Sequence, residues 1–166
     1  MKNLISIPVL AFAVMLQTAL VSRITLLSGA ADLVLMILIT WALQEQVKSS
    51  WHWAGLAVIM SAFVSATSPI VLILSYFMAV GFSRYVLRLT WQTPILALFA
   101  VTFFSTLFLH IATYFSLYLS GVKMLFGDAL ALITLPSIFL NLLIALPVHS
   151  LIRDLSLWVY PVEDII

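Results

Sequence analysis

The chain has 166 residues, 64% of them hydrophobic, and it carries only seven basic and six acidic side chains. Water-soluble domains contain about 25% charged residues, whereas the charged share here is 8% and the mean hydropathy is +1.24. This composition excludes a water-soluble fold and indicates a single membrane domain. The net charge of +1, with no basic run, excludes nucleic acid as a partner. The absence of cysteine excludes disulfides and thiolate metal sites.

The apolar runs are long and continuous, which favours transmembrane helices over the short alternating segments of a β-barrel. Charged side chains are kept to helix ends in a bilayer because burying a charge in hydrocarbon costs several kcal/mol. The uncharged interval between Lys2 and Arg23 predicts a first span over residues 4–22. This run is longer than the apolar region of a secretory leader, which favours an uncleaved anchor.

The next charges, Asp32 and Glu45, bracket a short second span over residues 30–45. The following interval of 35 uncharged residues is too long for one crossing, so the chain must turn back within it. Pro69 marks that turn, because proline ends a preceding helix. The third and fourth spans are therefore predicted over residues 53–66 and 70–85.

Residues 90–93 resemble an interfacial connector, and Pro94 suits the first turn of a fifth span over residues 94–119. The last uncharged interval predicts a sixth span over residues 129–152, interrupted by Pro136 and Pro147. The sequence thus predicts an all-α protein with six transmembrane helices.

Basic residues are distributed unevenly over the two sides of this six-helix arrangement. The side that holds both termini carries Lys2, Lys48, Arg84, Arg88 and Arg153, against Arg23 and Lys123 on the other side. Because cytoplasmic loops are enriched in Lys and Arg, both termini are expected in the cytoplasm.

Ionisable groups within the spans are few. The three histidines, His52, His110 and His149, form no i, i+4 pair, so we expect no metal site, and His110 is interpreted as a helix-packing residue. Asp32 is interpreted as the N-cap of the second helix, with contact to a partner or pairing with Arg23 as alternatives. No catalytic residue is identified.

Arg84 and Arg88 are four residues apart and therefore lie on one helix face. They are interpreted as orienting charges at a cytoplasmic boundary, with a partner, anionic lipid or the C-terminus of the fourth helix as alternative contacts.

Small residues follow one face of the third span. Gly55 begins this stretch, and the spacings Ser61-xxx-Ser65 and Ala62-xxx-Ala66 would let another helix approach closely, within the chain or in a partner. In the sixth span, Asn141 is predicted to bond across helices, and Pro147 is predicted to kink or end its helix.

Three stretches resemble the MreD family, the small polytopic membrane proteins of the bacterial cell-elongation machinery. They are residues 14–20 around Gln17, residues 31–43 from Ala31-Asp32 through Trp41, and residues 135–153, in which Asn141 precedes Pro147 by an aliphatic run. One departure is in the third span, which in MreD-like proteins commonly ends a glycine-rich run on an aspartate and here has no acidic residue.

The resemblance implies a non-enzymatic, multi-pass scaffold of the bacterial cytoplasmic membrane that binds MreC and works with MreB, RodA and a class B penicillin-binding transpeptidase in peptidoglycan synthesis. It also implies no cofactor and a bundle like that of the S components of ECF-type vitamin transporters. A substrate-binding S component is therefore the alternative function, although the sequence offers few pocket residues for it: Tyr114, Tyr118, Asp128 and Asp32. An intramembrane enzyme is the least favoured reading.

Overall fold

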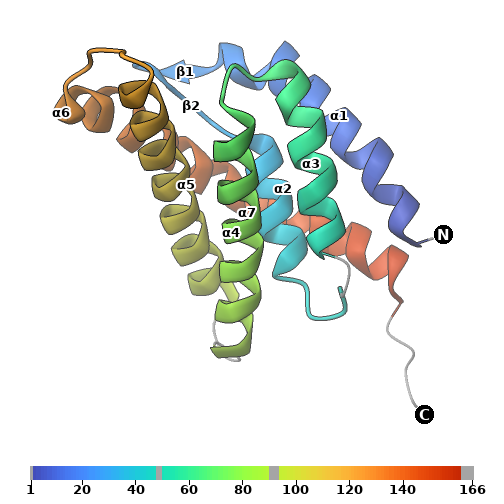
Figure 1. Ribbon diagram of the computed structural model, residues 1–166. Helices are drawn as coiled ribbons and strands as arrows, with labels where there is room; N and C mark the ends of the chain where they lie inside the picture. Colours follow the sequence, from blue (N-terminus) through green and yellow to red (C-terminus); the bar gives the residue numbers. More distant parts are fainter. Residues whose placement is uncertain (1, 48–49, 90–93, 162–166) are drawn as a thin grey trace.

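The computed structural model describes residues 2–47, 50–89 and 94–161. Lys48, the connector of residues 90–93 and residues 162–166 lie outside this described part. Within it, the chain is helical apart from one short hairpin, as Figure 1 shows. The principal helices are α1 (Ser6–Ala19), α2 (Leu33–Ala42), α3 (Ser50–Val64), α4 (Pro69–Leu89), α5 (Pro94–Leu119) and α7 (Leu135–Val159), with a single turn, α6 (Phe126–Asp128), before the last.

Four helical segments are long and apolar enough to cross a membrane: Ser6–Arg23, Pro69–Leu89, Pro94–Leu119 and Phe126–Val159. The helices α2 and α3 are shorter, with 10 and 15 residues. The predicted all-helical class and its apolar helices are confirmed, while the full set of six crossings stays a prediction.

The ends of α5 agree with the predicted span. Pro94 occupies its first position, where the missing N–H needs no partner. Beyond its last residue, Gly121 adopts a positive φ of 89°, and Val122 N–H donates to the Leu117 carbonyl at 3.1 Å. This is a Schellman-type ending, which requires the left-handed conformation that glycine adopts most readily.

The short helix α2 lies at the centre of the bundle and contacts α1, α3, α4, α5 and α7. Every residue from Val34 to Ala42 is buried. A helix of ten residues is about 15 Å long at 1.5 Å per residue, half of a hydrocarbon core of about 30 Å. Its two ends therefore lie within the protein, and other helices must supply partners for its terminal backbone groups.

A hairpin that the sequence analysis did not predict precedes α2. The strands β1 (Thr25–Leu26) and β2 (Gly29–Ala30) are antiparallel, with Thr25 paired to Ala30. Leu27 in the turn has a φ of 54°. In Figure 1 the hairpin lies at the same end of the molecule as the α3–α4 turn and the α5–α6 loop.

The last helical run extends further than predicted. A π-helical segment, Ala129–Thr134, joins α6 to α7, so helix continues over 34 residues, or about 50 Å. Pro147 lies inside α7, which ends only at Val159. The alternative that Pro147 ends the helix is wrong, and prolines are tolerated inside membrane helices where neighbouring groups satisfy the freed carbonyl.

The predicted face of small residues on α3 is not formed as expected. The helix ends at Val64, so Ser65 and Ala66 lie in the following turn, where Ser65 Oγ accepts from Thr67 N–H at 3.1 Å. A Cβ built on Gly55 meets no atom within 4 Å, so no close helix contact requires glycine there. On α3 the buried small residues are Ala54, Ala57 and Ser61, and a second row of buried small residues lies on α4, at Ser75, Ala79 and Ser83.

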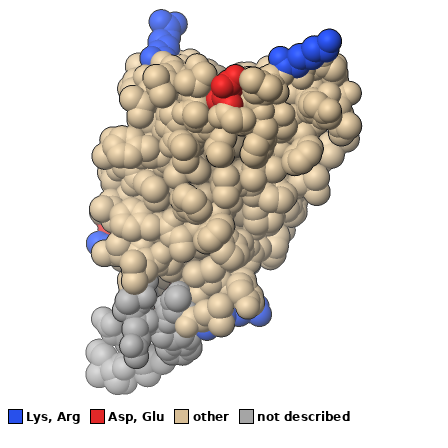
Figure 2. Space-filling model, turned by 90° about the vertical axis from the view of Figure 1, so that its left-hand side faces the viewer, with Lys and Arg blue, Asp and Glu red and all other residues tan. Residues whose placement is uncertain are grey.

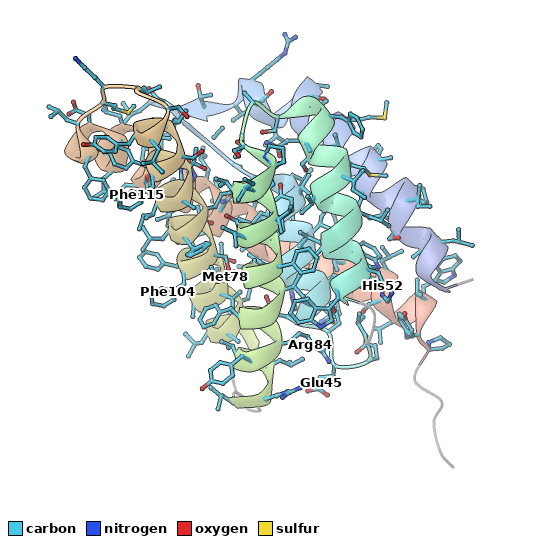
Figure 3. All side chains as sticks on the ribbon, in the orientation of Figure 1. Glu45, His52, Met78, Arg84, Phe104 and Phe115 are labelled. Atoms are coloured by element: carbon cyan, nitrogen blue, oxygen red, sulfur yellow. The ribbon has the colours of Figure 1, made fainter. Side chains whose placement is uncertain are left out.

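The outer surface carries large apolar side chains. Figure 3 shows Phe104 and Phe115 projecting from α5 away from the bundle, and both are exposed. Charged side chains in Figure 2 lie at the upper rim and toward the lower end of the visible face, and most of that face is uncharged. This surface suits contact with hydrocarbon.

Candidate functional site

The segment that leads into α2 lies along α7 and is held by its side chains and backbone. Ser137 Oγ accepts from Ala30 N–H at 3.1 Å, and Asn141 Oδ1 accepts from Asp32 N–H at 2.7 Å. One turn earlier on the same helical run, the Leu132 carbonyl accepts from Ser28 N–H at 3.0 Å. The extended segment of residues 28–32 thus donates every second N–H to the last helical run.

Pro136 explains why the Leu132 carbonyl is free to accept. Proline has no N–H, so the carbonyl four residues earlier loses its usual helical partner. Ser28 N–H supplies the replacement. Pro136, which was predicted to interrupt the sixth span, therefore frees a carbonyl group that accepts a hydrogen bond from the segment before α2.

Gly29 allows this close approach. A Cβ built on it would lie 2.6 Å from the Ile133 carbonyl oxygen, 2.7 Å from Ser137 N and 2.8 Å from Pro136 Cβ. Distances under 3.0 Å to backbone atoms leave no room for a side chain. Nothing in the sequence alone distinguishes Gly29, because a glycine in a loop has many explanations.

Gln17, in α1, completes the frame around the start of α2. Its Nε2 donates to the Ala31 carbonyl at 2.9 Å, and its Oε1 accepts from Leu33 N–H at 2.7 Å. One amide side chain thus satisfies backbone groups on both sides of Asp32. On the far side, Asn141 Nδ2 donates to Thr106 Oγ1 of α5 at 2.9 Å.

Asp32 is the N-cap of α2, since its Oδ1 accepts from Leu35 N–H at 2.9 Å. The alternative pairing with Arg23 is absent from the described residues, where the one ion pair joins Arg153 and Asp154. The three stretches that carry the family resemblance, around Gln17, Asp32 and Asn141, therefore meet in one hydrogen-bonded cluster.

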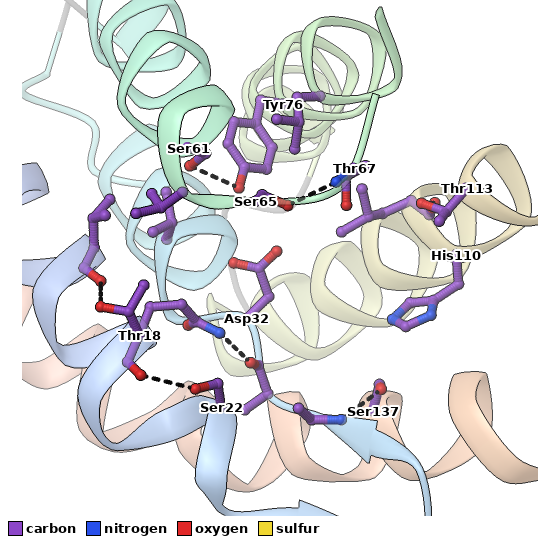
Figure 4. A pocket seen from close by; sticks show the side chains of 18 of the residues that line it. Thr18, Ser22, Asp32, Ser61, Ser65, Thr67, Tyr76, His110, Thr113 and Ser137 are labelled. Atoms are coloured by element: carbon purple, nitrogen blue, oxygen red, sulfur yellow. Dashed lines mark hydrogen bonds between the residues drawn. The ribbon is translucent and has the colours of Figure 1, made fainter. Parts of the chain in front are cut away.

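A cavity of about 540 Å³ opens beside this cluster, and we call it the Asp32 cavity. Its walls come from α1, the segment before α2, α3, α4, α5 and the last helical run, and the polar groups that line it include Gln17, Asp32, Ser61, Tyr76, His110, Thr113 and Ser137. In Figure 4 the Asp32 carboxylate projects into the space between the Ser61–Tyr76 pair and His110.

Tyr76 and His110 are cavity residues that the sequence analysis did not connect with Asp32. Tyr76 is buried, and its hydroxyl lies 3.3 Å from Ser61 Oγ. His110, interpreted from the sequence as a packing residue, lines the cavity wall. The phenol and the imidazole come from different helices, and no sequence spacing joins them to Asp32.

The other residues named for a ligand pocket lie elsewhere. Tyr114, Tyr118 and Asp128 do not line the Asp32 cavity. The Tyr114 hydroxyl donates to the Met124 carbonyl at 3.1 Å, and its ring stacks on Tyr118. In the described part of the chain, no group of three or more His, Cys, Asp or Glu is placed to hold a metal ion.

The opposite end of α2 is closed by Arg84. Its Nη1 donates to the carbonyls of Ala42 at 3.3 Å and Gln44 at 3.2 Å. Figure 3 labels Arg84. A cation at a helix C-terminus stabilises the free carbonyls and the negative end of the dipole. Arg84 thus contacts the C-terminus of α2, which the sequence did not indicate, while Arg88 is exposed.

Trp41 belongs to the same closed end. It is 1% exposed, and its ring stacks on Trp53 with centroids 4.0 Å apart. Trp41 therefore contributes to packing inside the chain.

The described residues form a helical bundle with four helices of membrane-crossing length and an internal polar cavity at one end of α2. Comparison with models of protein families, with curated proteins and with solved structures finds no significant match.

Proposed function

We propose that the chain is an MreD-like membrane scaffold of a bacterial cell-elongation complex, which binds MreC and helps to position the peptidoglycan synthases RodA and a class B penicillin-binding transpeptidase, with MreB on the cytoplasmic side. In this proposal it spans the cytoplasmic membrane six times with both termini in the cytoplasm. The bundle would be of the S-component type. No turnover is required of it.

The meeting of Gln17, Asp32 and Asn141 is the observation that supports this proposal most. The resemblance rests on three stretches that are far apart in the sequence, and each supplies one of these residues to a single cluster. Such a cluster gives those residues one shared structural purpose, namely to hold a short second helix inside the bundle.

The four segments of membrane-crossing length differ in the share of their residues that is buried, and this difference indicates where the helix of a single-pass partner could pack. Only 17% of the crossing segment that contains α1 is buried, compared with 39% for each of the other three. Phe12 and Met15 on α1 are exposed. A partner helix along α1 would cover the segment with the smallest buried share, so we expect MreC to contact this helix.

Co-purification tests the partner. Tagged chain is solubilised in mild detergent and the bound proteins are identified, with an MreC-like protein as the expected result. Recovery of a transporter ATPase pair without an MreC-like protein would contradict the scaffold proposal.

Cysteine cross-linking tests whether MreC contacts α1. The chain has no cysteine of its own, so each introduced cysteine is the sole reactive thiol. Phe12→Cys and Met15→Cys on α1 are compared with Phe104→Cys, which is exposed on α5. We expect cross-links to MreC from the two α1 positions and little from α5. Equal yields at all three positions would contradict a contact along α1.

The alternative function, capture of a small substrate as an S component, is favoured by the Asp32 cavity, whose volume of about 540 Å³ lies within the usual range for ligand sites. Purification with a transporter ATPase pair would support it.

A further inference from the structure

The Asp32 cavity combines one charge with an otherwise neutral lining. Asp32 is the sole Asp, Glu, Lys or Arg among the described residues that line it. No described cation forms an ion pair with Asp32. Inside a site of low dielectric, an unpaired carboxylate favours a ligand of positive charge far more strongly than the same group does in water.

Further polar groups are available around this carboxylate. Among the residues that the structure describes, the hydroxyls of Tyr76 and Ser61 have only their mutual contact of 3.3 Å, and the His110 ring has no hydrogen bond. By contrast, Gln17 and Ser137 are engaged with the backbone before α2 and serve as fixed walls. A ligand can therefore bond to Asp32, His110 and the Ser61–Tyr76 pair without breaking the cluster that holds α2.

The aliphatic part of the lining comes from Val14, Val34, Val64, Leu72, Leu109 and Ile133, and further hydroxyl groups come from Thr18, Ser22, Ser28, Ser65, Thr67 and Thr113. A bare metal ion would need several oxygen or nitrogen ligands at short distance, whereas this cavity has one carboxylate in about 540 Å³. An organic body fits the apolar walls better than an ion does.

We propose that the Asp32 cavity binds a small organic cation, a primary amine with an apolar body. Its ammonium group pairs with Asp32, and its body contacts the aliphatic walls. This inference goes beyond the scaffold proposal and does not depend on it. It is tested on purified chain without partners, so its failure would leave the MreC experiment untouched.

Phenethylammonium and its uncharged counterpart 2-phenylethanol serve as probes, with thermal unfolding in detergent as the readout. The amine is expected to raise the unfolding temperature in a saturable manner, because a ligand of the native state stabilises that state. The alcohol is expected to do so weakly.

Asp32→Asn is the informative variant, since asparagine caps a helix about as well as aspartate and removes only the charge. We expect it to weaken binding of the amine about tenfold and to leave binding of the alcohol unchanged. Asp128→Asn is the matched control, because it makes the same change at an exposed residue outside the cavity.

A second experiment measures the electrostatic effect of Asp32 in the cavity from the reaction rates of an introduced thiol, without a reversible ligand. Ser65→Cys places the sole thiol of the chain on the exposed rim of the cavity. The thiol is treated with a cationic trimethylammonium methanethiosulfonate and with its anionic sulfonate counterpart, and the ratio of the cationic to the anionic reaction rate is measured. The negative charge of Asp32 should raise this rate ratio, and Asp32→Asn should lower it about fivefold. Asp128→Asn should leave the ratio unchanged.

The proposal is supported if Asp32→Asn weakens stabilisation by the amine and lowers the rate ratio, while Asp128→Asn changes neither. Equal stabilisation by amine and alcohol, no stabilisation by the amine, or the same rate ratio in both backgrounds would overturn it.

Discussion

The two ends of α2 meet the same physical requirement by different means. Both ends lie inside the bundle, so their free backbone groups cannot rely on water. At the C-terminal end, Arg84 bonds two carbonyls and Trp41 stacks on Trp53. At the N-terminal end, Asp32, Gln17 and Asn141 satisfy the N–H groups and a cavity remains beside them. The C-terminal end is held by a cation and aromatic packing beside a smaller cavity of about 330 Å³, and the N-terminal end is held by hydrogen bonds beside the larger Asp32 cavity.

This comparison predicts which end is more sensitive to single changes. Loss of one side chain at the N-terminal end removes partners from a buried backbone that nothing else reaches. At the C-terminal end, the aromatic stack continues to fill the space. Substitutions at the N-terminal end should therefore destabilise the protein more.

The largest effect is expected for Asn141→Leu. The change leaves Asp32 N–H and the Thr106 hydroxyl without the partners that Asn141 gave them. We expect a loss of about 3 kcal/mol in the free energy of unfolding, measured by denaturation in mixed micelles. Leu143→Ala, at an exposed position on the same helix, should cost much less, and an equal loss in both would show that Asn141 has no special part.

Gly29→Ala should follow, with a loss of about 2 kcal/mol, because the new methyl group would overlap backbone atoms at 2.6 and 2.7 Å. Gly55→Ala is the matched control. Its methyl group meets nothing within 4 Å, and alanine is favoured over glycine inside a helix by about 1 kcal/mol. The two substitutions should shift the unfolding temperature in opposite directions, and a shift of the same sign would contradict the close approach at Gly29.

Asp32→Ala should cost about 1 kcal/mol through loss of the cap to Leu35 N–H, whereas Asp32→Asn should cost little. Unfolding temperatures of the two variants separate the structural role of the side chain from its charge. A large loss in Asp32→Asn would mean that the charge itself holds the fold.

The smallest effect is expected for Arg84→Gln, at about 0.5 kcal/mol, because the closed end keeps its aromatic packing. Arg88→Gln, on the same face of α4 and exposed, should change the unfolding temperature less. An Arg84→Gln loss greater than that of Asn141→Leu would reverse the comparison between the two ends.

Local chemistry made part of this structure predictable. Pro94 marks the start of α5, and the carboxylate of Asp32 identifies the start of α2, because each requires only its immediate neighbours. Intervals between charges likewise located the apolar runs, since the cost of burying charge is the same in any bundle.

Features that depend on contacts between distant segments were not predictable. Pro147 does not end its helix, because α7 continues to Val159, and the predicted kink stays a prediction. The Ser61-xxx-Ser65 spacing suggested a helix face, but α3 ends between the two residues. The Asp32 cavity draws on residues as far apart as Gln17, His110 and Ser137, and only the fold brings them together.

The attachment of residues 28–32 to α7 has a consequence for biosynthesis. Ser137 and Asn141 leave the ribosome more than 100 residues after the segment that they hold. Until then, Gln17 of α1 can bond the start of α2, but the N–H groups of Ser28, Ala30 and Asp32 lack their partners. The hydrogen bonds from residues 28–32 to the last helical run can therefore form only late in biosynthesis, when that run has reached the membrane, and they then fix the position of the second helix.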